Sequence, residues 1–287
     1  MLLNPFTKTN CMLIDLTKAD TPLVQQWLQS AIAPRPIGLV STIDKDEVPN
    51  LAPFSFFNLF SANPPIAIFS PARRVRDNSM KHSFLNLYEV PEVVINIVTY
   101  DILHRVNLAS AEFPKNENEF IKSGLTMQPA TVVRPFMVKE SKIKFECRVT
   151  ELKPLGENGG AGNLVFCELM RMHINDSIIG VDGQIDPFEL DQVGRLGGNW
   201  YCKTGSANLF ELAKPLSQPV GIDRLPAVLK NSPAFSAEKL AQLAGIAAIP
   251  EGTINIDPYI QRQAASSLDQ GDIKKAWELL VSTKTVV

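Results

Sequence analysis

Runs of apolar and β-branched residues, separated by polar turns, dominate the first part of the chain. Residues 37–43 form one such run, the polar residues 44–47 interrupt it, and residues 48–54 form the next run. This alternation predicts a β-hairpin. Further apolar runs predict strands at 66–69, 93–98, 141–152 and 163–174. A glycine-rich loop joins the last two segments, as a hairpin turn requires.

Helical spacing of apolar residues interrupts these strands and becomes the rule after about residue 206. In the first part of the chain it predicts helices at 21–28, 79–88, 102–111 and 117–122. In the last part it predicts helices at 235–244, 259–268 and 273–281. Because the connections between strands are long and irregular, the sequence predicts a mainly β fold, a β-barrel with helices, rather than a doubly wound sheet.

These patterns predict three parts of the chain. They are an N-terminal segment with a short helix at 1–30, the barrel domain at 31–205 and a helical C-terminal extension at 206–287. The boundary near residue 206 marks the point where strand patterns end and helical spacing interrupted by prolines begins.

Charge and composition exclude several classes of partner. The net charge of −2 provides no basic surface for nucleic acid, and no apolar run approaches the roughly 20 residues that span a bilayer. The four cysteines lack metal-ligand or redox-pair spacing, and the N-terminus has no secretory pattern. We therefore expect a cytoplasmic protein with free thiols, which binds neither nucleic acid nor membranes.

The first predicted hairpin carries small polar side chains where larger apolar ones would fill a barrel better. These side chains are Ser41, Thr42, Asn50 and Ser55. They supply both donors and acceptors, and Ala52 and Pro53 keep the neighbouring backbone accessible. A flat heteroaromatic ring with polar edges would suit this surface. A solvated sheet face is the alternative reading of the hairpin alone.

A cationic cluster follows the predicted strand 66–69. Arg73, Arg74 and Arg76 come first, and Lys81 and Ser83 stand at the expected start of a helix. Cations, a hydroxyl and free helix N–H groups together favour an anion, although a solvated helix start would have the same composition. The hairpin and this cluster together indicate a mononucleotide cofactor.

The chain resembles the flavin reductase-like family of FMN-binding split β-barrel proteins, from about residue 31 to residue 201. The motifs that carry this resemblance are Pro34–Ile37, Asn50–Phe57, Asn63–Pro65, Lys81–Asn86, Phe113–Pro114, Gly124–Thr126, and Arg195–Gly198 with Tyr201. His82 and Ser83 depart from the usual aspartate and threonine, and Ser83 keeps the hydroxyl.

The resemblance implies a six-stranded, Greek-key-like split barrel that forms a homodimer, with one FMN per subunit at or near the interface. The residues expected at the cofactor are Ser41, Thr42, Asn50, Ala52, Pro53, Ser55, Arg74, Lys81, Ser83 and Arg195. The isoalloxazine ring would meet the first three of these and Ala52. Ser55 would meet the ribityl chain or the phosphate. Arg74, Lys81 and Ser83 would hold the phosphate, and Arg195 would lie near the pocket, from the same or the partner subunit.

The same resemblance implies an NAD(P)H-dependent flavin oxidoreductase, in which hydride passes from the nicotinamide to the flavin. Such chemistry needs neither a catalytic side chain nor a metal, and the partner would be a small-molecule electron acceptor or free flavin. His173, on a predicted strand, is expected to be packed or hydrogen-bonded rather than catalytic. Two alternatives remain: an FMN-binding electron carrier or flavin-holding protein without direct NAD(P)H oxidation, and an interaction protein whose tail carries the function.

Overall fold

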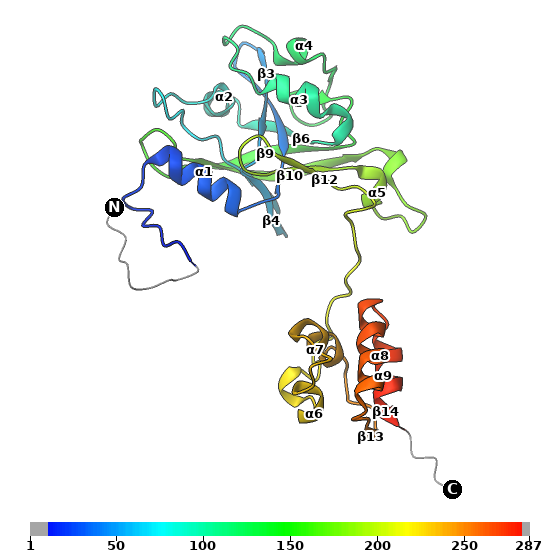
Figure 1. The fold of residues 1–287 in the computed structure, drawn as a ribbon. Coiled ribbons are helices and arrows are strands. Elements are labelled where there is room, and N and C mark those ends of the chain that lie inside the picture. Colours follow the sequence, from blue (N-terminus) through cyan, green and yellow to red (C-terminus); the bar gives the residue numbers. More distant parts are fainter. Residues whose placement is uncertain (1–10, 283–287) are drawn as a thin grey trace. The chain divides into compact units, whose positions relative to one another are not determined.

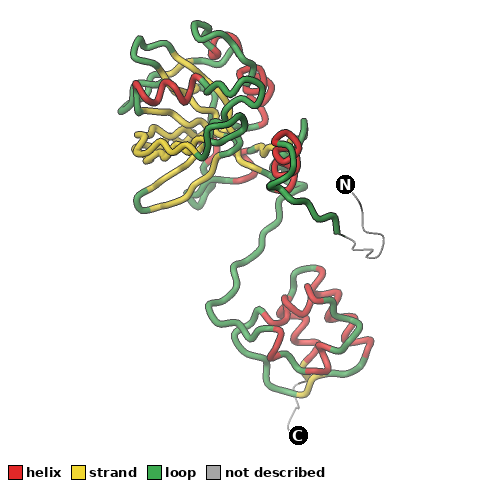
Figure 2. The backbone as a smooth tube through the Cα atoms, turned by 90° about the vertical axis from the view of Figure 1, so that its left-hand side faces the viewer, coloured by secondary structure: helices red, strands yellow, loops and turns green. Residues whose placement is uncertain are grey.

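The computed structural model describes residues 11–282 and divides the chain into two compact units. The division falls between Leu209 and Phe210, close to the residue 206 expected from the sequence. The first unit contains the large sheet. The second consists mostly of helices, shown in red in Figure 2.

Seven antiparallel strands form the main sheet of the first unit, in the order β3-β2-β6-β9-β10-β5-β4 among the described residues. The strands are β2 (Gly38–Ile43), β3 (Pro49–Phe54), β4 (Phe57–Ala62), β5 (Pro65–Phe69), β6 (Glu92–Ile97), β9 (Ile143–Pro154) and β10 (Asn163–Ile174). Both predicted hairpins are confirmed. The resemblance led us to expect six strands, and the main sheet exceeds that number. Its additional edge strand is β4, which begins soon after β3 and pairs with β5.

Two smaller sheets complete the β structure of this unit. In one, β11 (Val193–Arg195) pairs with both β1 (Arg35–Pro36) and β12 (Tyr201–Lys203). In the other, β7 (Met127–Gln128) pairs with β8 (Met137–Val138). The first of these sheets brings the N-terminal end of the barrel domain together with residues near 195, although the two are far apart in the sequence.

Buried apolar side chains of the central strands form the core. Val40, Phe69, Ile95 and Val165 belong to one such cluster, which also includes Phe84 from the covering helix α2 (His82–Glu89). Gly38 lies where β2 is closely packed, because a Cβ there would lie 3.2 Å from side-chain atoms of both Ile95 and Phe57, closer than most Cβ contacts. The alternation seen in the sequence thus becomes a closely packed sheet.

Helices α2, α3 and α4 pack against strands β2 and β3 (Figure 1). The helices of this unit are α1 (Thr21–Ala31), α2 (His82–Glu89), α3 (Leu103–Ala109), α4 (Glu119–Ser123) and α5 (Pro187–Leu190), with 3-10 turns at Tyr100–Ile102 and Asp176–Ile178. All four helices predicted for this part are present. Helix α4 ends at Gly124, whose φ of 69° suits the left-handed position after a helix.

The second unit has a hydrophobic core of its own. Its elements are α6 (Ala227–Lys230), α7 (Ala237–Ala244), α8 (Pro258–Asp269), α9 (Ile273–Leu280), a 3-10 turn at Ile222–Arg224, and the short strands β13 (Thr253–Ile254) and β14 (Val281–Ser282). Leu229, Leu243 and Trp277 are buried in this core, and the Trp277 indole donates a hydrogen bond to the Leu243 carbonyl at 3.2 Å. The three helices predicted after residue 206 are confirmed. No helix among the described residues has the length and apolar character needed to cross a membrane.

Candidate functional site

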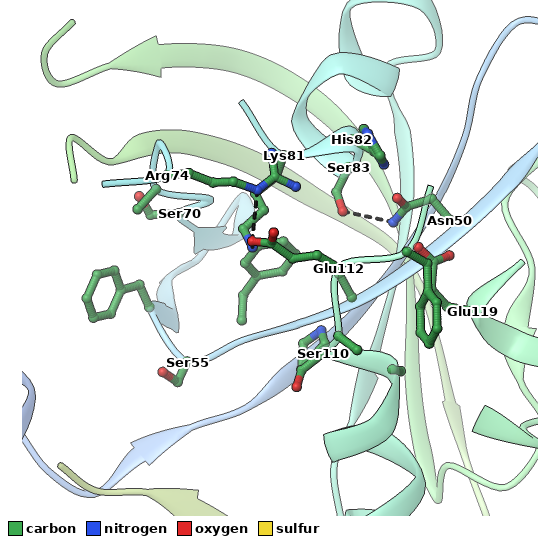
Figure 3. A pocket seen from close by; sticks show the side chains of 18 of the residues that line it. Asn50, Ser55, Ser70, Arg74, Lys81, His82, Ser83, Ser110, Glu112 and Glu119 are labelled. Carbon is green, nitrogen blue, oxygen red and sulfur yellow. Dashed lines mark hydrogen bonds and ion pairs between the residues drawn. The ribbon is translucent and has the colours of Figure 1, made fainter. Parts of the chain in front are cut away.

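A cavity of about 330 Å³ opens where the hairpin β2–β3, the start of α2 and residues 109–113 meet (Figure 3). Seven of the ten residues expected at the cofactor line it: Asn50, Ala52, Pro53, Ser55, Arg74, Lys81 and Ser83. The hairpin residues and the cationic cluster are separate in the sequence. The fold places them in one cavity because α2 packs against β2 and β3.

Arg74 is held firmly at the cationic end of this cavity. Its Nη1 donates to the Ser79 hydroxyl and to the Met80 carbonyl, each at 2.9 Å. Its Nε donates to Oε1 of Glu112 at 2.9 Å, and only 14 % of the side chain is exposed. The guanidinium is therefore oriented before any ligand arrives.

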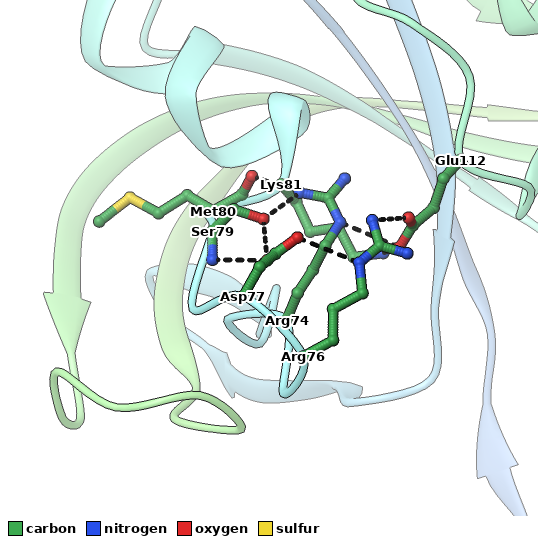
Figure 4. A network of polar contacts seen from close by, with 7 residues as sticks. All are labelled: Arg74, Arg76, Asp77, Ser79, Met80, Lys81 and Glu112. Atoms are coloured by element: carbon green, nitrogen blue, oxygen red, sulfur yellow. Dashed lines mark hydrogen bonds and ion pairs between the residues drawn. The ribbon is translucent and has the colours of Figure 1, made fainter.

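The Glu112 carboxylate forms ion pairs with more than one basic side chain (Figure 4). Besides Arg74, it forms an ion pair with Arg76, and the Lys81 ammonium lies 3.9 Å from its Oε1. Hydrogen bonding from Arg74 lowers the pKa of Glu112. Burial and the neighbouring Arg74 lower the pKa of Lys81 and also that of His82. Arg74, Arg76 and Lys81 thus surround the carboxylate of Glu112, which stays ionised.

The other part of the cavity wall is polar but less strongly charged. Asn50 Nδ2 donates to the Ser83 hydroxyl at 2.9 Å, and both residues are buried. Glu119, at the start of α4, accepts a hydrogen bond from the Leu51 N–H of the edge strand β3 at 3.0 Å. Burial raises the pKa of Glu119. Glu119 was not among the residues expected at the cofactor, although Glu119–Phe120 matches the family pattern.

Ser41 and Thr42 lie outside the cavity lining, and both are fully buried on β2. The Thr42 hydroxyl accepts a hydrogen bond from the Asn86 amide at 3.1 Å. The Ser41 hydroxyl has no hydrogen-bond partner among the described residues. Their polarity was visible in the sequence, whereas their covering by neighbouring elements follows from the fold.

Arg195 lines a neighbouring cavity of about 170 Å³, which shares Pro53, Ser55 and Ser110 with the first. Its guanidinium lies 4.4 Å from the centre of the Tyr201 ring and donates to the Gly198 carbonyl at 2.6 Å. The structure therefore places Arg195 beside the main cavity and not in its wall.

Arg35 is a residue whose importance the sequence did not reveal. It is buried, and its Nη1 donates to the carbonyls of Gln29 and, at 2.6 Å, Ile32 at the end of α1. Its Nη2 donates to the Leu196 carbonyl at 3.0 Å. Arg35 thereby fixes α1, which contributes Gln25 and Gln29 to the cavity wall. The available signal was an arginine between two prolines, within the Pro34–Ile37 motif.

Comparison with known proteins decides the family. The sequence profile of the flavin reductase like domain matches residues 30–181. The chain belongs to this flavin reductase-like family. Membership supports an oxidoreductase that uses a flavin cofactor, and the second unit lies beyond the matched residues.

Individual relatives agree with this assignment. An uncharacterized protein of Aquifex aeolicus is 35 % identical over 186 residues, which cover 65 % of this chain and 92 % of the relative. The crystal structure of nitrilotriacetate monooxygenase component B from Bacillus cereus matches with a TM-score of 0.66 and 31 % identity, over 71 % of this chain and all of that one. A split-barrel domain of the flavin reductase kind from Shewanella frigidimarina matches with a TM-score of 0.58 and 25 % identity, over 70 % of this chain and 96 % of its own. The fold of the first unit is therefore the split barrel.

Proposed function

We propose that this protein is an FMN-binding oxidoreductase that takes hydride from NADH or NADPH and passes electrons to a small-molecule acceptor or to free flavin. The observation that carries the proposal is a single cavity with cations at one end and polar side chains at the other. Its wall comes from the part of the chain that matches the flavin reductase-like family.

The cationic end has the donors that a phosphate needs. Arg74 is already oriented by Ser79 and Met80. Within the described residues, the Lys81 ammonium makes no hydrogen bond, and its ion-pair partner Glu112 is 3.9 Å away. Because charge-assisted hydrogen bonds to phosphate are strong, these two side chains would hold the FMN phosphate.

The remaining wall suits the ring and the ribityl chain. Asn50 uses its amide nitrogen to bind Ser83, which leaves its carbonyl oxygen to accept a hydrogen bond from a ligand. Ser55 and Ser110 line both this cavity and the neighbouring one, and their hydroxyls can donate or accept. A bound flavin would supply the hydride chemistry, while these residues would bind and orient it.

An anaerobic reduction experiment tests the proposal. Purified protein is mixed with FMN, freed of excess flavin, and then given NADH or NADPH without oxygen. We expect the visible flavin band to bleach. Flavin that binds but stays yellow would instead support the electron carrier without direct NAD(P)H oxidation. A colourless protein that does not bind added FMN would overturn the FMN assignment.

The homodimer is part of the same proposal. β4 is an edge strand of the main sheet, and it exposes 58 % of Leu59 and 65 % of Phe60. Beside it lies an apolar groove of about 440 Å³, whose wall includes Phe57, Phe145 and Leu169. Exposed apolar surface along an unpaired strand edge favours association, and we propose that a second copy of the chain covers it.

Sedimentation velocity tests the dimer. We expect the chain to sediment as a dimer and Leu59→Lys to shift it toward the monomer. Phe188→Lys, at another exposed apolar position in α5, is the matched control and should leave the dimer unchanged. A monomer at micromolar concentration, before any substitution, would contradict this part of the proposal.

The cytoplasmic location is also a proposal, and it rests on the free thiols of Cys147, Cys167 and Cys202.

A further inference from the structure

Glu112 occupies the donors that a phosphate would use. Its Oε1 accepts from Arg74 Nε at 2.9 Å and lies 3.9 Å from the Lys81 ammonium, and its Oε2 pairs with Arg76 (Figure 4). Arg74 and Lys81 line the cavity together with Glu112. A ligand phosphate at the cationic end therefore meets an anion that belongs to the protein.

The position of Glu112 allows its carboxylate to move away. Glu112 lies in the connection between α3 and α4, outside helices and strands, and 37 % of its side chain is exposed. Arg74, by contrast, is also held by two hydrogen bonds, to Ser79 and Met80, that do not involve Glu112. The cation is thus fixed, whereas its carboxylate partner can exchange.

We propose that Glu112 is an internal counter-ion, which a ligand's phosphate displaces from Arg74 and Lys81, so that the carboxylate and the phosphate compete for these two cations. The proposal rests on the proposed function, because FMN is the expected ligand. It adds a residue that keeps the cations paired when the site is empty and lowers the affinity of the same site for phosphate.

The direction of the exchange follows from the charges. Replacing the single charge of Glu112 with another single charge leaves the attraction to Arg74 and Lys81 nearly unchanged. A phosphate monoester carries about −1.5 to −2 charges at pH 7 and offers three acceptor oxygens, so the exchange then favours the ligand. A flavin without phosphate cannot displace Glu112, and it binds only through the rest of the wall.

Titration of flavin fluorescence in the full chain tests the exchange, with FMN and riboflavin as probes. Relative to the wild-type chain, we expect Glu112→Gln to lower the Kd for FMN by about 2- to 5-fold, the scale of partly exposed ion pairs, and to leave the Kd for riboflavin unchanged. The gain should shrink at 1 M salt, where such charges are screened. Arg74→Gln should abolish the preference for FMN over riboflavin.

Glu117→Gln is the matched control, because Glu117 lies in the same connection but pairs with Lys122 outside the cavity lining. It should change neither Kd. An unchanged or raised Kd for FMN in Glu112→Gln would overturn the proposal, as would an equal gain for riboflavin. If Glu112→Gln does not fold, Glu112→Ala serves in its place with the same expected result.

Inorganic phosphate separates this proposal from the proposed function. We expect phosphate alone to raise the Tm of Glu112→Gln more than that of the wild-type chain, and equal shifts would contradict the exchange. If neither flavin binds the wild-type chain, the FMN assignment fails while the phosphate result still decides the role of Glu112. If FMN binding depends on Arg74 but Glu112→Gln has no effect, the FMN assignment stands and the exchange fails.

Discussion

Two carboxylates, Glu146 and Glu112, each gather several donors, but their surroundings differ. Glu146 on β9 is fully buried and accepts from the Thr131 N–H at 2.9 Å, the Thr131 hydroxyl and Val132 N–H at 2.6 Å, and lies 2.5 Å from His173 Nε2. Glu112 is partly exposed and pairs with side-chain cations. His173 is thus hydrogen-bonded, as expected from the sequence.

The difference between the two groups lies in what can replace each carboxylate. The Glu146 side chain is fully buried, accepts hydrogen bonds from the backbone N–H groups of residues 131 and 132, and lies outside the wall of the main cavity. Burial opposes its ionisation, but the hydrogen bonds from Thr131, Val132 and His173 outweigh burial and lower its pKa to about 2. Glu112 faces a cavity that a ligand can enter. We therefore expect substitutions of Glu146 to change the free energy of unfolding and substitutions of Glu112 to change ligand affinity.

The largest expected effect is on stability. Glu146→Ala removes a buried carboxylate together with its four hydrogen bonds to Thr131, Val132 and His173, and we expect it to lower the free energy of unfolding by about 2–4 kcal/mol. Glu151→Ala, at an exposed position of the same strand, should change it little. Chemical denaturation measures both. If Glu146→Ala keeps the free energy of unfolding of the wild-type chain but binds flavin more weakly, Glu146 serves ligand binding and the proposed difference between the two carboxylates is wrong.

Low pH should reduce the stability of the wild-type chain, because Glu146 becomes protonated. The pKa of Glu146 is lowered in the folded state from 4.5 to about 2, so its ionised form stabilises the fold above about pH 4.5. This contribution, about 3 kcal/mol for such a shift, is lost as the pH falls toward 2. Denaturation from pH 7 to pH 3 should show the stability gap between wild type and Glu146→Gln narrowing. A gap that stays constant would assign the effect to packing and not to charge.

Removing the Lys81 ammonium beside Glu112 should weaken ligand binding. Lys81→Ala should weaken FMN binding by about 1.5–3 kcal/mol, the range for hydrogen bonds to charged groups, and leave riboflavin binding unchanged. Lys153→Ala, at an exposed position of β9, is the control. Isothermal titration measures both affinities. Unchanged FMN affinity would remove Lys81 from the phosphate site.

The smallest expected effect is on flavin affinity, through Asn50 in the uncharged part of the cavity wall. Asn50→Ala removes one ligand acceptor and the bond to Ser83, and should weaken FMN and riboflavin equally, by about 1 kcal/mol. The far-ultraviolet circular dichroism spectrum should stay the same. If the variant unfolds, Asn50 serves the structure of the hairpin and not the ligand.

Local patterns determined much of the fold. Both predicted hairpins are present because each joins two runs rich in β-branched and apolar residues through a polar or glycine-rich turn. The helices after residue 206 follow from apolar residues spaced three and four apart. Strand β4 was not predicted, because its exposed Leu59 and Phe60 lack the alternation of a half-buried strand.

The candidate site was partly readable from the sequence. The cations near Lys81 and the small polar residues of the hairpin each had a local signature, and seven of the expected residues line the cavity. Residue types alone could not separate Asn50, which reaches the cavity, from Thr42, which pairs with Asn86 beneath α2. Which face of a strand a helix covers depends on packing between distant segments.

The sequence by itself determined most of the helices and strands of the main sheet, the family and a cluster of basic residues suited to an anion, because these depend on residue type and short-range spacing. Only the tertiary structure decided which carboxylate meets which donors. Glu112 reaches Arg74 across 38 positions of the chain, and Glu146 reaches His173 across 27. Contacts over such separations are fixed by how strands and helices pack, so the counter-ion at the cationic end became visible only in the folded chain.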